Sequence, residues 1–275
     1  MEDEMIKFWL DMCPVISEKV EEAIRKARND PLVSSVTKIG ADGTPTHKID
    51  EYAENAAIKV LESTGKSLIL ISEEIGTVKI GDNLAEAVII MDPLDGTTNA
   101  MKNIPCYGIS IAIAGMSNDD ELGSITLDDI CIGFVKNFPT GDVYVAVKDS
   151  FARKNGESIN VSDVYRANEA TLSTYIYRAK GKLDRVCSGV RRMRIMGAIA
   201  IEMCYVAEGI YDVFLDIEAV RVLDIAASQL IIKEAGGYVT DTHSNVLSSQ
   251  IDLLAKTTII ATTNSQLQKD IVRLL

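Results

Sequence analysis

The first part of the chain carries apolar side chains at helical spacing. Apolar residues recur every three or four positions over Met5–Arg28, and an Asn-Asp-Pro stop signal follows at 29–31. We therefore expect one long amphipathic helix there. A polar, glycine-containing stretch from Lys38 to Lys48 is typical of a mobile functional loop. The apolar positions that follow Asp50 predict a second helix.

Short β-branched runs come next and predict a group of strands. Ser67–Ile71 and Ala87–Met91 have the pattern of buried strands, and carboxylates follow each of them directly. Three more runs, at Gly108–Ala114, Ile130–Val135 and Val143–Val147, are separated by polar turns. The first half of the chain is thus expected to be α+β, with helices followed by a strand meander.

Beyond residue 150 the pattern changes to an alternation of strands and helices. This alternation predicts an α/β unit. We place the boundary at residue 150, which makes 1–150 an α+β lobe and 151–275 an α/β lobe that supplies Asp224. The elements expected in the second lobe are strands at Thr171–Tyr175, Val213–Leu215 and Thr258–Thr262, and helices at Ala198–Glu208, Val222–Ala235 and from Ser265.

The composition is that of a folded protein with an acidic balance. Of the 275 residues 47% are hydrophobic, and 40 Asp and Glu outweigh 28 Lys and Arg to give a net charge of -12. This charge repels polyanions, so we expect neither nucleic acid nor a membrane surface as a partner. No apolar run reaches signal-peptide or membrane-span length, which predicts a cytoplasmic protein. A phosphorylated small molecule fits an acidic protein whose carboxylates hold divalent cations.

The segment DPLDGTTN, residues 92–99, is the most informative one for chemistry. Its proline and glycine argue against a continued strand or helix. A turn there would let Asp92, the Leu94 carbonyl and Asp95 converge on a hard cation, with N–H groups from Thr97 onward facing an anion. The competing interpretation is an ordinary Asp-Pro and Asp-Gly turn whose side chains are solvated.

Two further acidic positions complete a possible metal site. Glu73 and Glu74 follow the strand Ser67–Ile71, and neighbouring strands would bring both sets of acids together. Asp224 begins a strongly apolar helix, where an acid can also simply complement the helix dipole. With two histidines and no CxxC pair, these oxygen donors favour Mg²⁺, with Mn²⁺ as a possible substitute, over Zn²⁺. Such cations suit the hydrolysis of a phosphate monoester.

In these segments the chain resembles the archaeal-type inositol monophosphatase and fructose-1,6-bisphosphatase family of metal-dependent, lithium-sensitive phosphatases. The resemblance spans nearly the entire chain, and DPLDGTTN is its most specific segment. It implies a layered αβαβα sandwich of α+β and α/β parts, a small phosphorylated sugar or polyol as substrate, and a homodimer. The supporting segments are GADGTPTHKID (40–50), ISEE (71–74), DPLDGTTN (92–99), RIMGAIAIEMCYVAEG (194–209) and VLDIAA (222–227).

The resemblance also implies which residues hold the metals. Glu73, Asp92 and the Leu94 carbonyl would hold the first cation. Asp92, Asp95 and Asp224 would hold the second, and a third, weaker cation would lie near Glu73. These assignments come from the family, whereas the preference for a hard cation follows from the oxygen donors themselves.

Catalytic and phosphate-binding roles are implied in the same way. Glu74 and Thr97, the latter linked to Asp50, would position or deprotonate the attacking water. The phosphate would lie against the backbone of Gly96 and Thr97. The loop at Lys38–Thr46 would close over the site.

Candidate substrate contacts lie in the second half of the chain. Tyr177, Arg178 and Arg194 border predicted strands and have the chemistry to bind a second phosphate or sugar hydroxyls, although surface solvation is the plain alternative. Asp216 is a candidate partner for a sugar hydroxyl, but its spacing from the final metal ligand differs from that of the animal enzymes. Leu223 stands where many relatives have Trp, which changes packing but no ligand.

The sequence therefore predicts a Mg²⁺-dependent phosphate monoester hydrolase that acts on inositol monophosphate and fructose 1,6-bisphosphate. A metal-activated water would attack phosphorus in line. Two alternatives stay open. One is the same chemistry on phosphoadenosine phosphate or another phosphorylated small molecule, and the other is a weakly catalytic family member that binds a protein partner.

Overall fold

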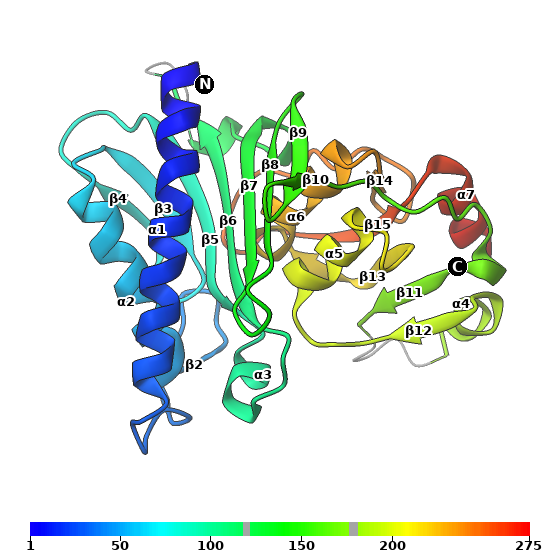
Figure 1. Ribbon diagram of the computed structural model, residues 1–275, viewed down its shortest axis with the longest axis horizontal. Helices are drawn as coiled ribbons and strands as arrows, with labels where there is room; N and C mark the ends of the chain where they lie inside the picture. Colours follow the sequence, from blue (N-terminus) through cyan, green and yellow to red (C-terminus); the bar gives the residue numbers. More distant parts are fainter. Residues whose placement is uncertain (118–121, 176–180) are drawn as a thin grey trace.

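In the computed structural model, which describes residues 1–117, 122–175 and 181–275, layers of helices alternate with two large sheets (Figure 1). The expected αβαβα sandwich is confirmed. Within the described residues one hydrophobic core lies between the first helices and the first sheet. A second lies between the two sheets and surrounds the helices there, and a third lies on the other face of the second sheet. No helix in these described ranges is long and apolar enough to span a membrane.

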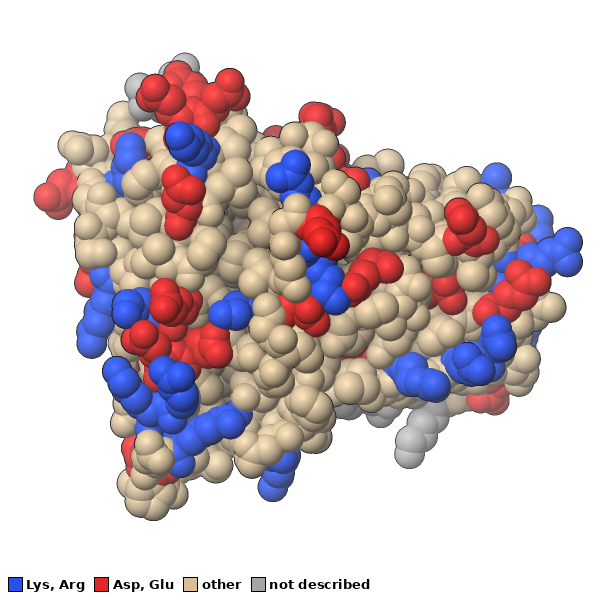
Figure 2. Space-filling view, viewed as in Figure 1, with Lys and Arg blue, Asp and Glu red and all other residues tan. Residues whose placement is uncertain are grey.

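The first layer consists of two long helices packed side by side, α1 (Asp3–Ala27) and α2 (Lys48–Ser63). Both were predicted. The buried stripe of α1 includes Trp9, Ile16 and Val20, which lie in the core against the first sheet. Acidic residues occupy the first turn of α1 and basic residues its last turn, which complements the helix dipole. Figure 2 shows the acidic group above the start of this helix.

The segment between these helices, for which the sequence predicted a mobile functional loop, contains a β-hairpin. Strands β1 (Val36–Ile39) and β2 (Pro45–His47) pair antiparallel. The turn between them is closed by Asp42, whose Oδ1 accepts the backbone N–H of Thr44 at 2.8 Å, and by Gly43 at φ +88°. These turn residues allow the β-branched residues on either side to pair.

The first large sheet has the strand order β10-β9-β8-β7-β6-β5-β3-β4. Its strands pair antiparallel except for β3 and β5, which run parallel with Ser72 opposite Met91. The carboxyl ends of β3 and β5 therefore meet, as predicted. The strands are β3 (Leu68–Ser72), β4 (Gly76–Ile80), β5 (Ala87–Asp95), β6 (Gly108–Gly115), β7 (Ile130–Asn137), β8 (Val143–Val147), β9 (Phe151–Lys154) and β10 (Glu157–Ser158).

Strand β5 is longer than predicted. It continues through Pro93 to Asp95, with an irregularity in its pairing between Asp92 and Asp95. The interruption in pairing accommodates a proline, which has no N–H for the ladder. Gly96 at φ +86° ends the strand, and the short helix α3 (Thr97–Lys102) begins immediately after it.

The second sheet is mixed, with the order β12-β11-β13-β15-β14. Helices α5 (Ile199–Ala207) and α6 (Val222–Glu234) fill the space between the two sheets, which explains why α6 has almost no polar face. The division into lobes at residue 150 stays a prediction. The remaining elements are β11 (Thr171–Thr174), β12 (Arg192–Arg194), β13 (Val213–Arg221), β14 (Tyr238–Thr240), β15 (Lys256–Thr262), α4 (Asp184–Gly189), α7 (Ser265–Leu274) and the short 3-10 turns Leu122–Ser124, Leu127–Asp129 and Ala167–Glu169.

Candidate active site

The predicted metal ligands lie where β3, β5 and the start of α6 come together. Glu73 directly follows β3, Asp92 and Asp95 lie in the last part of β5, and Asp224 lies in the first turn of α6. The side chains are within electrostatic reach, since Glu73, Asp95 and Asp224 all raise the pKa of Asp92. The fold thus brings together acids that are far apart in the sequence.

Arg221 lies inside this group of acids, at the end of β13 and three residues before Asp224. Its guanidinium forms a fork with Asp224, with Nε to Oδ2 at 3.0 Å and Nη2 to Oδ1 at 2.7 Å. It also contacts both oxygens of Glu73, at 2.7 and 3.1 Å, and donates to Oδ2 of Asp42 at 2.5 Å. One guanidinium therefore joins the β1–β2 hairpin, the end of β3 and the start of α6.

Asp95 has a second partner, the amino end of α5. Its Oδ1 accepts the N–H of Ile199 at 2.9 Å, and its Oδ2 accepts those of Ala200 and Ile201 at 3.0 and 3.4 Å. These are the first N–H groups of the helix, which have no partner within the helix. Asp95 thus caps α5 in addition to facing the other acids.

The proposed water-positioning residues are also close to one another. Thr97 Oγ1 donates to Asp50 Oδ1 at 2.8 Å, although the two residues are 47 positions apart. Glu74 accepts a hydrogen bond from the Thr46 hydroxyl of the hairpin. The hairpin approaches closely here, because a Cβ on Gly40 would stand 2.8 Å from Glu74 Oε2. The link between Thr97 and Asp50 that the resemblance implies is thus present.

Burial and mutual repulsion raise the pKa values of this group of carboxyls. Burial is the largest cause in each case and raises the pKa of Asp50 to about 6, of Glu74 to about 7 and of Asp95 to about 8. Nearby carboxylates add to the effect, Glu73 on Asp50 and Glu74, and Asp224 on Asp95. The folded chain therefore holds more protons near neutral pH than its unfolded form does.

We expect the protein in chelator to lose stability as the pH rises from about 4 to 8. Below about 4 both folded and unfolded carboxyls are protonated, whereas above it the unfolded chain releases protons that the folded chain still binds. Each such group lowers the free energy of unfolding by about 1.4 kcal/mol per pH unit across its window. Denaturant melts at successive pH values measure this slope.

Asp50→Asn provides the matched control for this slope. Its titration lies between the ordinary value of 3.8 and about 6. The variant should flatten the pH dependence below 6 and leave it unchanged between 6 and 8. A wild-type stability in chelator that rises steadily with pH would contradict the account.

The donor set fits hard divalent cations in its chemistry. All the donor side chains are carboxylates. The guanidinium of Arg221 contacts Asp42, Glu73 and Asp224, while Asp92 and Asp95 lie in the same cluster, so a surplus of negative charge remains. Oxygen donors with surplus negative charge suit Mg²⁺ or Mn²⁺. Within the described ranges no group of three or more His, Cys, Asp or Glu side chains is closed around one point as a metal site. The guanidinium of Arg221 lies between Glu73 and Asp224.

The candidate substrate-binding residues do not form one group in the described structure. Tyr177 and Arg178 lie outside the described residues. Arg194 is exposed on β12 and donates to the carbonyl of Met193 at 2.8 Å. Asp216 is buried and accepts the N–H of Glu218 at 2.9 Å within the irregular part of β13. Gly96 is in close contact, because a Cβ there would stand 3.0 Å from the carbonyl oxygen of Cys106.

Sequence reasoning missed three side chains at this site, Arg221, Asp42 and Thr46. All three lie within or beside segments that were singled out, GADGTPTHKID and VLDIAA. A single arginine beside a predicted metal-binding aspartate has no distinctive spacing, so only the fold reveals that it points at Glu73. The chain offered a signal only for the hairpin, in the Asp-Gly turn at 42–43.

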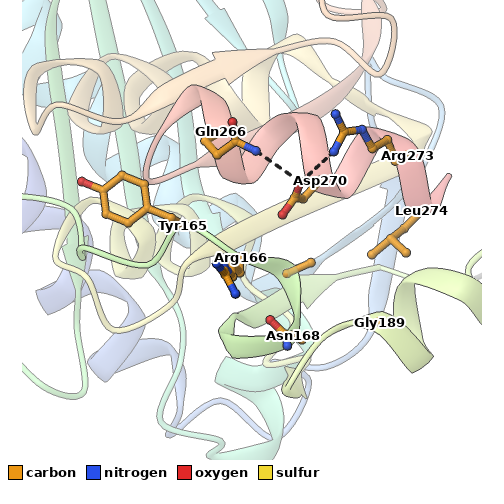
Figure 3. A pocket seen from close by; sticks show the side chains of 9 residues that line it. Tyr165, Arg166, Asn168, Gly189, Gln266, Asp270, Arg273 and Leu274 are labelled. Atoms are coloured by element: carbon orange, nitrogen blue, oxygen red, sulfur yellow. Dashed lines mark hydrogen bonds and ion pairs between the residues drawn. The ribbon is translucent and has the colours of Figure 1, made fainter.

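A cavity of about 550 Å³ lies at the far end of the second sheet, beside α7, and contains none of the predicted site residues (Figure 3). Asp270 accepts from Gln266 at 3.4 Å and from Arg273 at 3.3 Å at its edge. The residues predicted to bind metal lie in the acid cluster and not in this cavity. The other lining residues are Tyr165, Arg166, Ala167, Asn168, Gly189 and Leu274.

Comparisons with known proteins show which proteins this chain is similar to. A model of the inositol monophosphatase family matches residues 4–275. The chain is 41% identical to a fructose-1,6-bisphosphatase/inositol-1-monophosphatase of Methanothermobacter thermautotrophicus, over 100% of this chain and 99% of that protein. It is 38% identical to a bifunctional NADP phosphatase/NAD kinase of Methanococcus maripaludis, over 96% of this chain and 48% of that protein. A Pyrococcus horikoshii structure described as similar to inositol-1 monophosphatase superposes with a TM-score of 0.82 at 28% identity, covering 98% of each chain.

Proposed function

The chain belongs to the inositol monophosphatase family, and on that premise we propose that this phosphatase is a Mg²⁺-dependent hydrolase of small phosphorylated polyols and sugars. Inositol monophosphate and fructose 1,6-bisphosphate are the proposed substrates, in line with the name of the Methanothermobacter relative. The observation that carries the proposal is the cluster of buried carboxylates at the meeting ends of β3 and β5. Its surplus negative charge favours divalent cations over a bare phosphate.

We propose metal-binding roles for the carboxylates that lie together in the acid cluster. When bound, Mg²⁺, or Mn²⁺ in its place, polarises a phosphoryl oxygen and lowers the pKa of an attacking water. Glu73, Asp92 and the Leu94 carbonyl would hold one cation. Asp92, Asp95 and Asp224 would hold the other. The burial of the Asp92, Asp95 and Asp224 carboxylates supports the assignment, since buried acids need a counter-charge.

The hydroxyl of Thr97 is proposed to position the attacking water. It donates its hydrogen bond to Asp50, which leaves a lone pair of Oγ1 available to accept a hydrogen bond from the water. Glu74 would then accept the proton that the water loses, since its pKa is near neutral before any cation is counted. The phosphate would lie against the backbone at Gly96 and Thr97, where the glycine permits a close approach.

A second candidate substrate is NADP. The specific observation in its favour is that two bifunctional NADP phosphatase/NAD kinases are 38% and 36% identical to this chain, which spans about half of their length. NADP carries a phosphate monoester on its ribose, so the same carboxylates would serve. Arg194 is a candidate for contacting the part of either substrate that lies beyond the phosphate. The role of Asp216 in binding a sugar hydroxyl stays a prediction. The homodimer also stays a prediction.

A phosphate-release panel tests the proposed function. It compares inositol 1-phosphate, fructose 1,6-bisphosphate, NADP and phosphoadenosine phosphate, each with saturating Mg²⁺ and with chelator. We expect release from the first two in Mg²⁺ that exceeds release from phosphoadenosine phosphate. Release mainly from NADP would favour the second candidate, and no release from any ester would favour the weakly catalytic partner-binding alternative.

A further inference from the structure

Arg221 occupies the interior of the acid cluster, where its side chain is 21% exposed. Two of its three partners, Glu73 and Asp224, are the acids that the proposed function assigns to different cations. All four oxygens of these two carboxylates lie within hydrogen-bond distance of the guanidinium. A divalent cation that binds them must therefore share or replace these contacts.

The position of this side chain is set by its backbone. Arg221 is the N-cap residue of α6 at φ -66° and ψ 141°, and Asp224 lies in the first turn of the same helix. The irregular section of β13 just before it contains Ala219 in the left-handed region at φ 73°. This strained residue shows that the chain follows an unfavourable path into the residues that present Arg221 to the acids.

Asp42 gives the guanidinium a third partner that is not a proposed metal ligand. Its side chain is only 2% exposed, and its Oδ2 lies 2.5 Å from Nη1 of Arg221. The Asp42 carboxylate is itself held by the Thr44 N–H in the hairpin turn. A guanidinium that leaves Glu73 and Asp224 thus keeps its ion pair with Asp42. Replacement of Arg221 by a metal ion at the other two acids therefore leaves no buried cation unpaired.

From these contacts we propose that Arg221 is a built-in cation that competes with divalent metal for Glu73 and Asp224. This inference rests on the proposed metal-binding function. Arg221 holds the acids together by charge-assisted forks. Binding of Mg²⁺ or Mn²⁺ moves the guanidinium from the two ligands toward Asp42, so Arg221 sets the metal concentration at which the site fills.

The test is a calorimetric titration of Mn²⁺ into the full chain and into Arg221→Met, which keeps an unbranched apolar stem and removes the charge. A unit charge about 4 Å from a bound ion changes its affinity severalfold even in water and by far more in a protein interior, so the variant should bind Mn²⁺ at least about tenfold more tightly. Arg221→Lys keeps the charge but loses the fork, and its Kd should fall between the two. Arg273→Met removes an exposed arginine at the distant cavity and should leave the Kd unchanged.

A merely structural role for Arg221 gives the opposite result. If the arginine only orients the ligands, Arg221→Met binds Mn²⁺ equally or more weakly, and this overturns the inference. Circular dichroism of each variant identifies loss of fold, in which case Arg221→Lys decides by whether it binds more tightly than wild type. Wild type that binds no Mn²⁺ overturns both this inference and the proposed metal site, whereas wild-type binding that Asp92→Asn abolishes supports the site and leaves the inference to the arginine variants.

Discussion

Replacing Asp92 with Asn should reduce kcat/KM for phosphate release in Mg²⁺ by more than about 100-fold, since even partners of metal ligands cost 10- to 100-fold. Asp92 is the one side chain assigned to both cations. The fold should persist, because Oδ1 accepts only the local Leu94 N–H at 2.9 Å among the bonds described, and an amide oxygen can keep that bond. Steady-state phosphate release with wild-type and variant protein measures the loss.

The chain offers a closely matched control for this substitution. Asp252 accepts the N–H of Leu254, two residues on, at the same 2.9 Å, but it lies on the surface. Asp252→Asn should leave turnover unchanged. Near-normal turnover in Asp92→Asn would contradict the assignment of Asp92 as a metal ligand. Asp95→Asn is a less direct test, because it also disturbs the cap of α5.

Asp92→Asn should also raise the melting temperature of the protein in chelator. Burial and three neighbouring acids raise the pKa of Asp92 well above its ordinary value, so its ionised form is costly in the folded state. An uncharged Asn removes this cost. Lower activity together with higher metal-free stability is the combination expected of a residue kept for binding cations.

Removing divalent cations should abolish activity and lower stability together. We expect phosphate release to fall to background in chelator and to return with Mg²⁺ or Mn²⁺. A cation present at 100 times its Kd stabilises the folded state by about 2.7 kcal/mol, which corresponds to a rise of about 5–10 °C in Tm. Thermal melts with and without Mg²⁺ measure this shift, and Asp92→Asn should lose most of it. Unchanged turnover in chelator would contradict the proposed chemistry.

Much of the fold was predictable because its elements depend on local patterns. The long helix α1 shows a clear period and a strong stop signal, and the strands of the first sheet carry β-branched runs. The meeting of the acids at β3 and β5 was predictable for the same reason, since carboxylates follow the apolar run of each of these neighbouring strands. Helix α6 was recognisable in spite of its burial, because it is bounded by Gly236 and Gly237.

The parts that could not be predicted depend on contacts between distant segments. Strand β5 runs through Pro93 because β6 pairs on both sides of the irregularity. The hairpin at β1 and β2 depends on a turn whose carboxylate also reaches Arg221. The cap that Asp95 provides to α5 joins residues more than 100 positions apart. No local pattern encodes such pairs.

Anomalous diffraction from crystals soaked with Mn²⁺ and inorganic phosphate tests the proposed metal site most directly. We expect strong peaks within about 2.0–2.6 Å of carboxylate oxygens of Glu73, Asp92, Asp95 and Asp224. Density for phosphate should lie beside them, near Gly96. Peaks only elsewhere on the molecule, or these four side chains turned toward separate partners at saturating Mn²⁺, would contradict it.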